Sequence, residues 1–237
     1  MALPILQQPT FEVYLKSLDK NVKFRPFLVK EEKILLMARE SDDNDSTVSA
    51  VKQVLQNCVV TDLDINTLPL FDVQMLFTHL RMKSIGETIT LQYTCNHPDE
   101  EGNECGKENR YNLNLNKVRY ETTPGHTNII QLTDEIGVKL RYPTMNSKLT
   151  DSEDILEDSY KLIAEHLDSV FDSEQVYTDY TREDLIQFID SLSTDQLDKI
   201  LNFFTTSPKV VLEDTAACKK CGTENKIYAE DLYSFFI

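Results

Sequence analysis

Cys218-Lys-Lys-Cys221-Gly222, near the end of the 237-residue chain, is the segment that most constrains how the chain folds. Two cysteines separated by two residues can point both sulfurs at one metal ion, and a following glycine keeps the turn free of Cβ clashes. Structural zinc takes four thiolate or imidazole ligands, so this half-site needs two more ligands from another part of the chain.

A second Cys-Gly turn at Cys105-Gly106 supplies the missing half, together with Cys95. The segment from Cys105 to Tyr111 and the segment from Cys221 to Tyr228 share an internal echo, because each reads Cys-Gly-x-Glu-Asn-basic and then reaches a tyrosine. Zinc ribbons are built from two such knuckles related by an approximate two-fold axis. We therefore predict one structural Zn²⁺ site with four ligands: Cys95, Cys105, Cys218 and Cys221.

Three alternatives to this site stay open. His97 replaces Cys95 as a ligand if Cys95 is not used. A thioredoxin-like redox pair needs a strand before the CxxC and a helix after it, and that context is missing here. The third alternative is that the four thiols are free and bind no metal. The fifth cysteine, Cys58, falls in an apolar helical stripe and is expected in the core.

The composition is that of a soluble globular protein, with 41% apolar and 27% charged residues. The formal net charge is −16, so long-range repulsion from phosphates makes the chain a poor general nucleic-acid binder. Residues 151–206 contribute most of this charge, with 15 Asp and Glu against three Lys and Arg. That distribution indicates a solvated face, or a face that meets a basic partner. No apolar stretch is long enough for a membrane span.

Hydrophobic periodicity predicts an α+β fold in four parts. We expect an N-terminal arm and helices in residues 1–86, and the first part of a zinc-ribbon-like antiparallel β module in 87–149. An acidic helical insertion is expected in 150–208, with N-caps at Thr181 and Thr194. Residues 209–237 complete the module and end in a helix. If the metal site forms, the ends of the insertion must lie close together.

No pattern in the sequence indicates catalysis. The GxSxG, Walker A, GxGxxG and HExxH motifs are all missing, and a four-cysteine zinc site has no open position for a substrate. We therefore predict a protein that is not an enzyme and that has no small-molecule substrate. The two chain ends are instead rich in apolar residues, which indicates packing or docking. The arm from Leu3 to Phe11 either docks on a partner or packs into the fold, and Phe235 and Phe236 are expected to fold back onto the core.

Two long segments, Arg25–Ala38 and Phe71–Gly86, resemble T4-type bacteriophage baseplate proteins of the hub and hub-assembly group. The strand Val138–Pro143 and the knuckle Cys218–Cys221 resemble the same group, and the likeness runs from about residue 22 to the end. It implies a non-enzymatic structural or assembly component of the central hub of a contractile tail's baseplate. Such a protein acts through contacts with other baseplate hub proteins. It would be found in the host cytoplasm during assembly, and retention in the virion tail stays open.

The competing hypothesis is a zinc-ribbon factor that binds nucleic acid or acts in transcription. Lys107, Arg110, Lys219 and Lys220 are among the basic residues around the two knuckles. Glutamates such as Glu104 lie between them and weaken any basic patch. We therefore favour protein partners over nucleic acid, and we expect no contact with a membrane.

Overall fold

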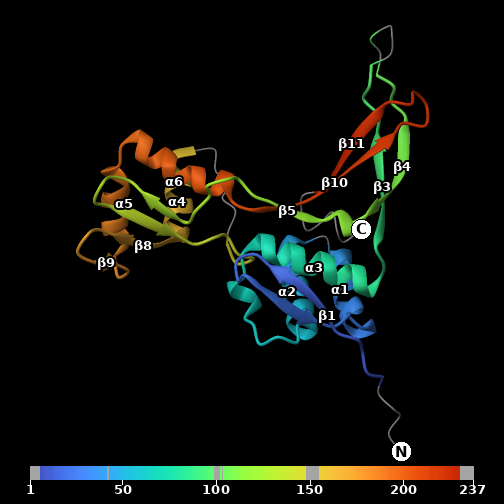
Figure 1. Cartoon of the computed structure of the whole chain (residues 1–237), viewed down its shortest axis with the longest axis horizontal. Coiled ribbons are helices and arrows are strands. Elements are labelled where there is room, and N and C mark those ends of the chain that lie inside the picture. The colour runs from blue at the N-terminus through green and yellow to red at the C-terminus, as the bar shows by residue number, and fades with distance from the viewer. Residues whose placement is uncertain (1–5, 42, 99–101, 103, 148–154, 230–237) are drawn as a thin grey trace, which may run out of the picture. The chain divides into compact units, whose positions relative to one another are not determined.

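The computed structural model describes residues 6–41, 43–98, 102, 104–147 and 155–229. It contains helices and several small antiparallel sheets, which confirms the α+β class (Figure 1). The chain divides into two compact units: unit 1 is residues 1–121 with 209–237, and unit 2 is residues 122–208. The expected C-terminal helix, the first residues of the arm (3–5), and Phe235 and Phe236 lie outside the described residues. None of the helices described is long and apolar enough to cross a membrane.

Unit 1 begins with a β-hairpin followed by three helices. Strand β1 (Phe11–Leu15) pairs with β2 (Lys20–Phe24), and Phe11 lies opposite Phe24. The helices are α1 (Val29–Ser41), α2 (Asn44–Cys58) and α3 (Leu70–Ser84). Helix α3 is apolar on most of its circumference and is the most deeply buried of the three, as a helix that packs on several sides must be.

A buried carboxylate joins the hairpin to the rest of unit 1. Asp72 on α3 is fully buried and accepts hydrogen bonds from the backbone N–H groups of Lys16 (3.0 Å) and Ser17 (2.9 Å). It also accepts a 2.6 Å bond from the hydroxyl of Tyr120. Buried charge is tolerated only when it is bonded in this way, so Asp72 fixes the hairpin turn against α3 and the strand that carries Tyr120.

The β module of unit 1 consists of two hairpins. Strand β3 (Thr88–Thr94) pairs with β4 (Glu108–Asn114), and β10 (Lys209–Ala217) pairs with both β11 (Glu224–Ala229) and β5 (Arg119–Glu121). One small core holds residues from both hairpins and from α3. Its buried members are Met82, Ile89, Leu113, Leu115 and Leu212.

Unit 2 combines a four-stranded antiparallel sheet with three helices. The strand order is β6 (Ile129–Gln131), β7 (Gly137–Leu140), β8 (Leu167–Phe171) and β9 (Val176–Tyr177). The helices are α4 (Ile155–His166), α5 (Arg182–Asp190) and α6 (Thr194–Thr206). Its buried core is made by one face of the sheet and the inner faces of the helices: Leu132, Val138, Leu140, Ile163, Leu167, Leu185, Ile189, Ile200 and Phe203.

The helix caps in unit 2 follow the expected chemistry with one shift. Thr181 forms a capping box with Asp184, as predicted. The second cap is Ser193, which forms a capping box with Gln196, and the expected cap Thr194 is the first residue of α6. Either hydroxyl can accept the N–H bond, and Ser193 has the glutamine three residues later that completes the box.

The inserted piece begins near residue 122, earlier in the chain than the expected start at residue 150. Strands β6 and β7, expected in the 87–149 part of the β module, pair with β8 and lie in unit 2. The physical reason lies in Leu167–Phe171. The periodicity predicts a helix there, but these residues form β8, which pairs with β7 on one side and β9 on the other. Both connections to unit 2 leave from one place, because Glu121 and Lys209 are paired across β5 and β10.

Candidate metal centre

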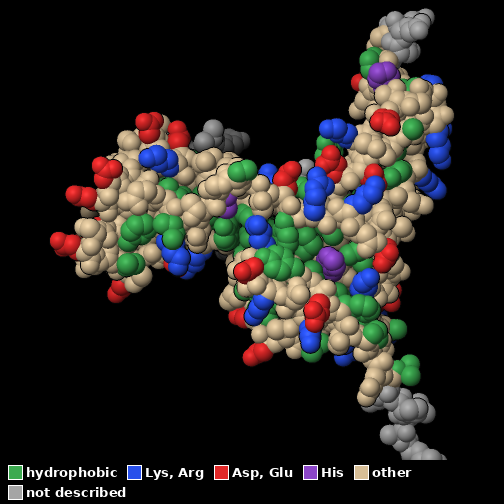
Figure 2. All heavy atoms as spheres, viewed as in Figure 1, with side chains coloured by type: hydrophobic (Ala, Val, Ile, Leu, Met, Phe, Trp, Pro, Cys, Tyr) green, Lys and Arg blue, Asp and Glu red, His purple; other side chains and the backbone are tan. Residues whose placement is uncertain are grey.

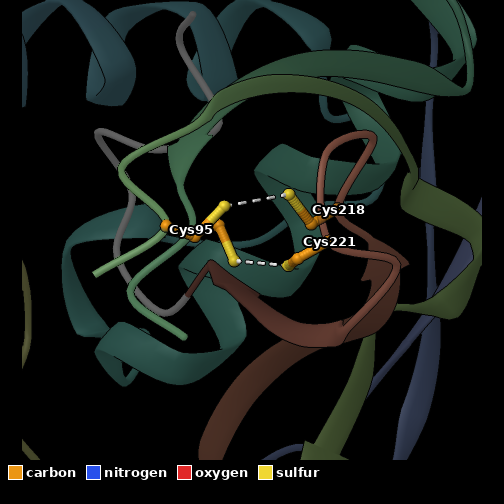
Figure 3. Close-up of side chains that lie close together, drawn as sticks. Cys95, Cys218 and Cys221 are labelled. Carbon is orange, nitrogen blue, oxygen red and sulfur yellow. Dashed lines mark hydrogen bonds between the residues drawn. The ribbon is translucent and has the colours of Figure 1, made fainter. Parts of the chain in front are cut away.

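The four predicted cysteines meet where the tips of the two hairpins come together. Cys95 follows β3, Cys105 precedes β4, Cys218 follows β10 and Cys221 precedes β11. Their sulfurs all lie within 4.8 Å of one another. The sulfurs of Cys95 and Cys221 are 3.7 Å apart, and those of Cys105 and Cys218 are 3.8 Å apart (Figure 3).

The two shorter separations match the edge of a four-sulfur metal site. A tetrahedron with metal–sulfur bonds of about 2.3 Å has sulfur–sulfur edges of about 3.8 Å. A disulfide would bring two sulfurs to about 2.05 Å, so the cysteines are not oxidised in pairs. The four cysteines can therefore hold a metal ion without rearranging the backbone.

The internal echo in the sequence corresponds to two knuckles with the same backbone hydrogen bonds. The N–H of Cys95 donates to the carbonyl of Lys107 (3.0 Å), and the N–H of Cys218 donates to that of Thr223 (2.9 Å). The N–H of Gly106 returns to the carbonyl of Cys95 (3.0 Å), and that of Gly222 to Cys218 (2.9 Å).

The glycines of the two knuckles also share a conformation. Gly106 has φ of 62° and Gly222 has φ of 75°, in the left-handed region that favours glycine. The loop from Cys95 to Cys105 is longer, and a bridge between Pro98 and Glu104 closes it before the knuckle begins. The extra residues therefore leave the knuckle geometry intact.

Backbone N–H groups favour the thiolate form of Cys218. The N–H of Cys221 lowers the pKa of the Cys218 thiol to about 6, and donation from Lys220 and Asn109 adds to this against the opposing effect of burial. The pKa of Cys105 rises to about 11, because desolvation and the bonds to Cys218 and Cys221 outweigh the N–H of Lys107. Four adjacent sulfurs cannot all ionise without a cation between them, and a bound metal would supply that charge.

The other candidate ligands lie elsewhere. The side chain of His97 is exposed, and its carbonyl accepts a 2.9 Å bond from the N–H of Cys105 while Cys95 occupies the cluster. Cys58 is fully buried in the helical part of unit 1, where burial raises its pKa to about 11. Cys58 is therefore a core residue, as expected, and it lies outside the group of thiols that could share a metal ion.

One polar residue at the site was missed from the sequence. Asn109 is only 3% exposed and bonds to atoms of both knuckles. The signal that could have revealed it is the echo itself, because asparagine holds the same position in both copies. Asparagine is otherwise common in turns that flank strands, so its presence alone does not indicate a role at the metal site.

The sequence matches the family described as T4 bacteriophage base plate protein over residues 8–237. The chain belongs to this family. Membership confirms the resemblance seen in the sequence and extends it to the β1–β2 hairpin. Neither the curated proteins nor the solved structures gave a match.

As a baseplate protein, the chain is a component of a bacteriophage tail structure that interacts with other baseplate proteins. The four-cysteine cluster lies within the part of the chain that the family covers, and it joins segments from the middle and the end of that part. The candidate metal site therefore belongs to a bacteriophage baseplate protein.

Proposed function

We propose that this baseplate protein is a non-enzymatic structural or assembly component of the central hub, stapled by one structural Zn²⁺. The observation that supports the metal is a group of four sulfurs within 4.8 Å of one another, contributed by two hairpins far apart in the sequence. Zinc suits an all-sulfur donor set, and it makes no demand on geometry beyond the tetrahedron.

A closed site of this kind holds structure and leaves no position for a substrate. Three of the four cysteines are buried or half-buried, and the backbone N–H of Lys220 lies 3.4 Å from the sulfur of Cys218. The hairpins are further joined by Tyr111, whose hydroxyl bonds Asp214 at 2.8 Å. Because the ligands are assembled only in the folded chain, the free energy of metal binding would add to folding stability.

Two surfaces suit the protein for contacts in a hub. Residues 6–10 are all exposed, and Leu6 is 82% exposed in front of the β1–β2 hairpin. An exposed leucine side chain such as that of Leu6 is stabilised when a partner covers it. Residues 122–208 carry 17 Asp and Glu against six Lys and Arg, which favours a partner with a basic surface.

Two measurements test this function. Elemental analysis of the purified protein should give about one zinc per chain, and the protein should co-purify with the hub proteins of its phage. If the native protein contains no metal and its four thiols can all be titrated, the proposed zinc site is refuted. Hub complexes assembled normally without the chain would remove the hub role.

Deleting residues 1–10 tests the arm separately. Zinc content and melting temperature should stay nearly constant while association with the hub partner weakens, because these residues lie before the first strand. Unfolding of the shortened protein would place the arm within the fold. Unchanged association would remove it from the interface.

Binding to nucleic acid is the second candidate, and one observation favours it. The side chains of Lys107, Arg110, Lys219, Lys220 and Lys226 are all exposed near the knuckles, and within the described residues none forms an ion pair. Figure 2 shows Lys and Arg side chains gathered on these hairpins. A gel-shift titration at low salt should show no tight, salt-sensitive binding if the hub role is correct, and tight binding would favour this second function.

A further inference from the structure

Asn109 connects the two halves of the candidate zinc site. It lies on β4, next to the first knuckle, and its side chain is 3% exposed. Its amide nitrogen donates to the sulfur of Cys218 at 3.5 Å and to the carbonyl of Lys107 at 2.9 Å. Its amide oxygen accepts a 3.0 Å bond from the backbone N–H of Lys219.

The three partners of Asn109 leave its amide group only one orientation. The N–H of Lys219 can only donate, so it must face the amide oxygen. The carbonyl of Lys107 can only accept, so it must face the amide nitrogen, and that places the second N–H of the amide near the sulfur. Both N–H donors and one acceptor position of this buried side chain are thus used at the knuckles, where an unmade bond would be costly.

Asn225 holds the same position in the second copy of the echo and provides a natural comparison. Its amide nitrogen donates to the carbonyl of Thr223 at 2.9 Å, as that of Asn109 does to Lys107. Within the described residues, Asn225 makes no bond to a cysteine sulfur or to the other knuckle. The shared bond shapes a local turn, whereas the bonds to Cys218 and Lys219 belong to Asn109 alone.

We propose that Asn109 is a positioning residue of the metal site, one that orients the sulfur of Cys218 and locks the second knuckle onto the first. This inference rests on the proposed zinc site. An amide N–H directed at a thiolate stabilises its charge and fixes its direction, as outer-shell partners of metal ligands generally do. Because Asn109 also holds the N–H of Lys219, it fixes the backbone of the Cys218–Cys221 turn from the other hairpin.

The test compares Asn109→Asp with Asn225→Asp. Aspartate keeps the size of asparagine and can still accept from Lys219, but it cannot donate to the sulfur or the carbonyl. Competition with a chelator should show zinc affinity about 10–100-fold lower in Asn109→Asp, the range expected for loss of an outer-shell partner. The change in Asn225→Asp should be under about threefold. An uncharged pair, Asn109→Ala and Asn225→Ala, separates the lost hydrogen bonds from the added charge.

Cobalt substitution gives a signature that a general loss of stability would not produce. The thiolate-to-cobalt absorption should shift in both Asn109 variants and stay as in the wild type in both Asn225 variants. Equal affinity losses at the two positions, or unchanged absorption in the Asn109 variants, would overturn the inference. Wild-type protein that binds no metal would instead refute the zinc site itself.

Hydrogen exchange provides a test if the Asn109 variants do not fold. In the wild-type protein, the amide of Lys219 should exchange at least about tenfold more slowly than the same amide in an unstructured peptide. Exchange at the rate of a free amide would show that the bond to Asn109 is absent in solution, and would overturn the inference.

Discussion

The ring of Phe171 lies on the backbone of Gly137, where the two residues pair across β8 and β7. A Cβ atom on Gly137 would be only 2.3 Å from the tip of the ring. Gly137 and Lys139 point away from the core that holds Val138, so the ring covers the outer face of the sheet. Glycine is thus required here for space rather than for an unusual backbone angle.

Gly137→Ala should therefore destabilise unit 2 by about 1–3 kcal/mol, the usual cost of overpacking. Urea unfolding followed by a probe in unit 2 measures the change. In a Phe171→Ala background the same substitution should cost much less, because the ring is gone. An additive double-mutant cycle would show that the contact has no energetic role.

Cys221→Ser should reduce bound zinc well below one per chain and lower the melting temperature, because metal binding is linked to folding. Elemental analysis and thermal melts measure both effects. Cys58→Ala is the matched control, since Cys58 is buried in the core and is not part of the four-cysteine cluster. It should lower stability while leaving the zinc content unchanged; loss of zinc in the control alone would contradict the assignment of ligands.

Tyr120→Phe should destabilise unit 1 by about 1–3 kcal/mol, because it removes the hydroxyl that donates to the buried Asp72. Burial and this hydrogen bond both raise the pKa of Tyr120, so its hydroxyl remains a donor at any ordinary pH. Tyr14→Phe is the control, because Tyr14 bonds Asp19 on the exposed hairpin turn. Equal losses in the two variants would contradict a special role for Asp72.

Glu31 should make unit 1 less stable in acid. Burial acts to raise the pKa of Glu31, but the bonds from Arg25 (3.0 Å) and from the N–H of Leu28 (2.9 Å) lower it overall. A lowered folded-state pKa stabilises the protein above the unfolded value of about 4.3, and this stability is lost as pH falls through the folded value. Glu31→Gln should flatten the dependence of unfolding free energy on pH between about 5 and 3. Glu32→Gln, at an exposed position, should leave it unchanged.

The cysteine cluster could be predicted from sequence because its information is local: each knuckle is a short pattern with its own glycine. Strand β8 could not be predicted from sequence, since Leu167 continues the apolar stripe of the preceding helix. The segment forms a strand because it pairs with β7, which is distant in the sequence. The roles of Asp72 and Asn109 were hidden for a related reason. Their partners lie up to 56 and 110 positions away, respectively, and no short pattern records such distances.

The placement of unit 2 between the knuckles imposes an order on synthesis. Cys105 and Cys218 are 113 positions apart. A ribosome adding about 5–20 residues per second needs roughly 6–23 s to cover that interval. During that time the cluster has only two of its four cysteines, and all of residues 122–208 is synthesised before the second knuckle. Closure of the four-cysteine cluster is therefore among the last events in making the protein, and if the cluster holds the proposed Zn²⁺, the ion is needed only at that late moment.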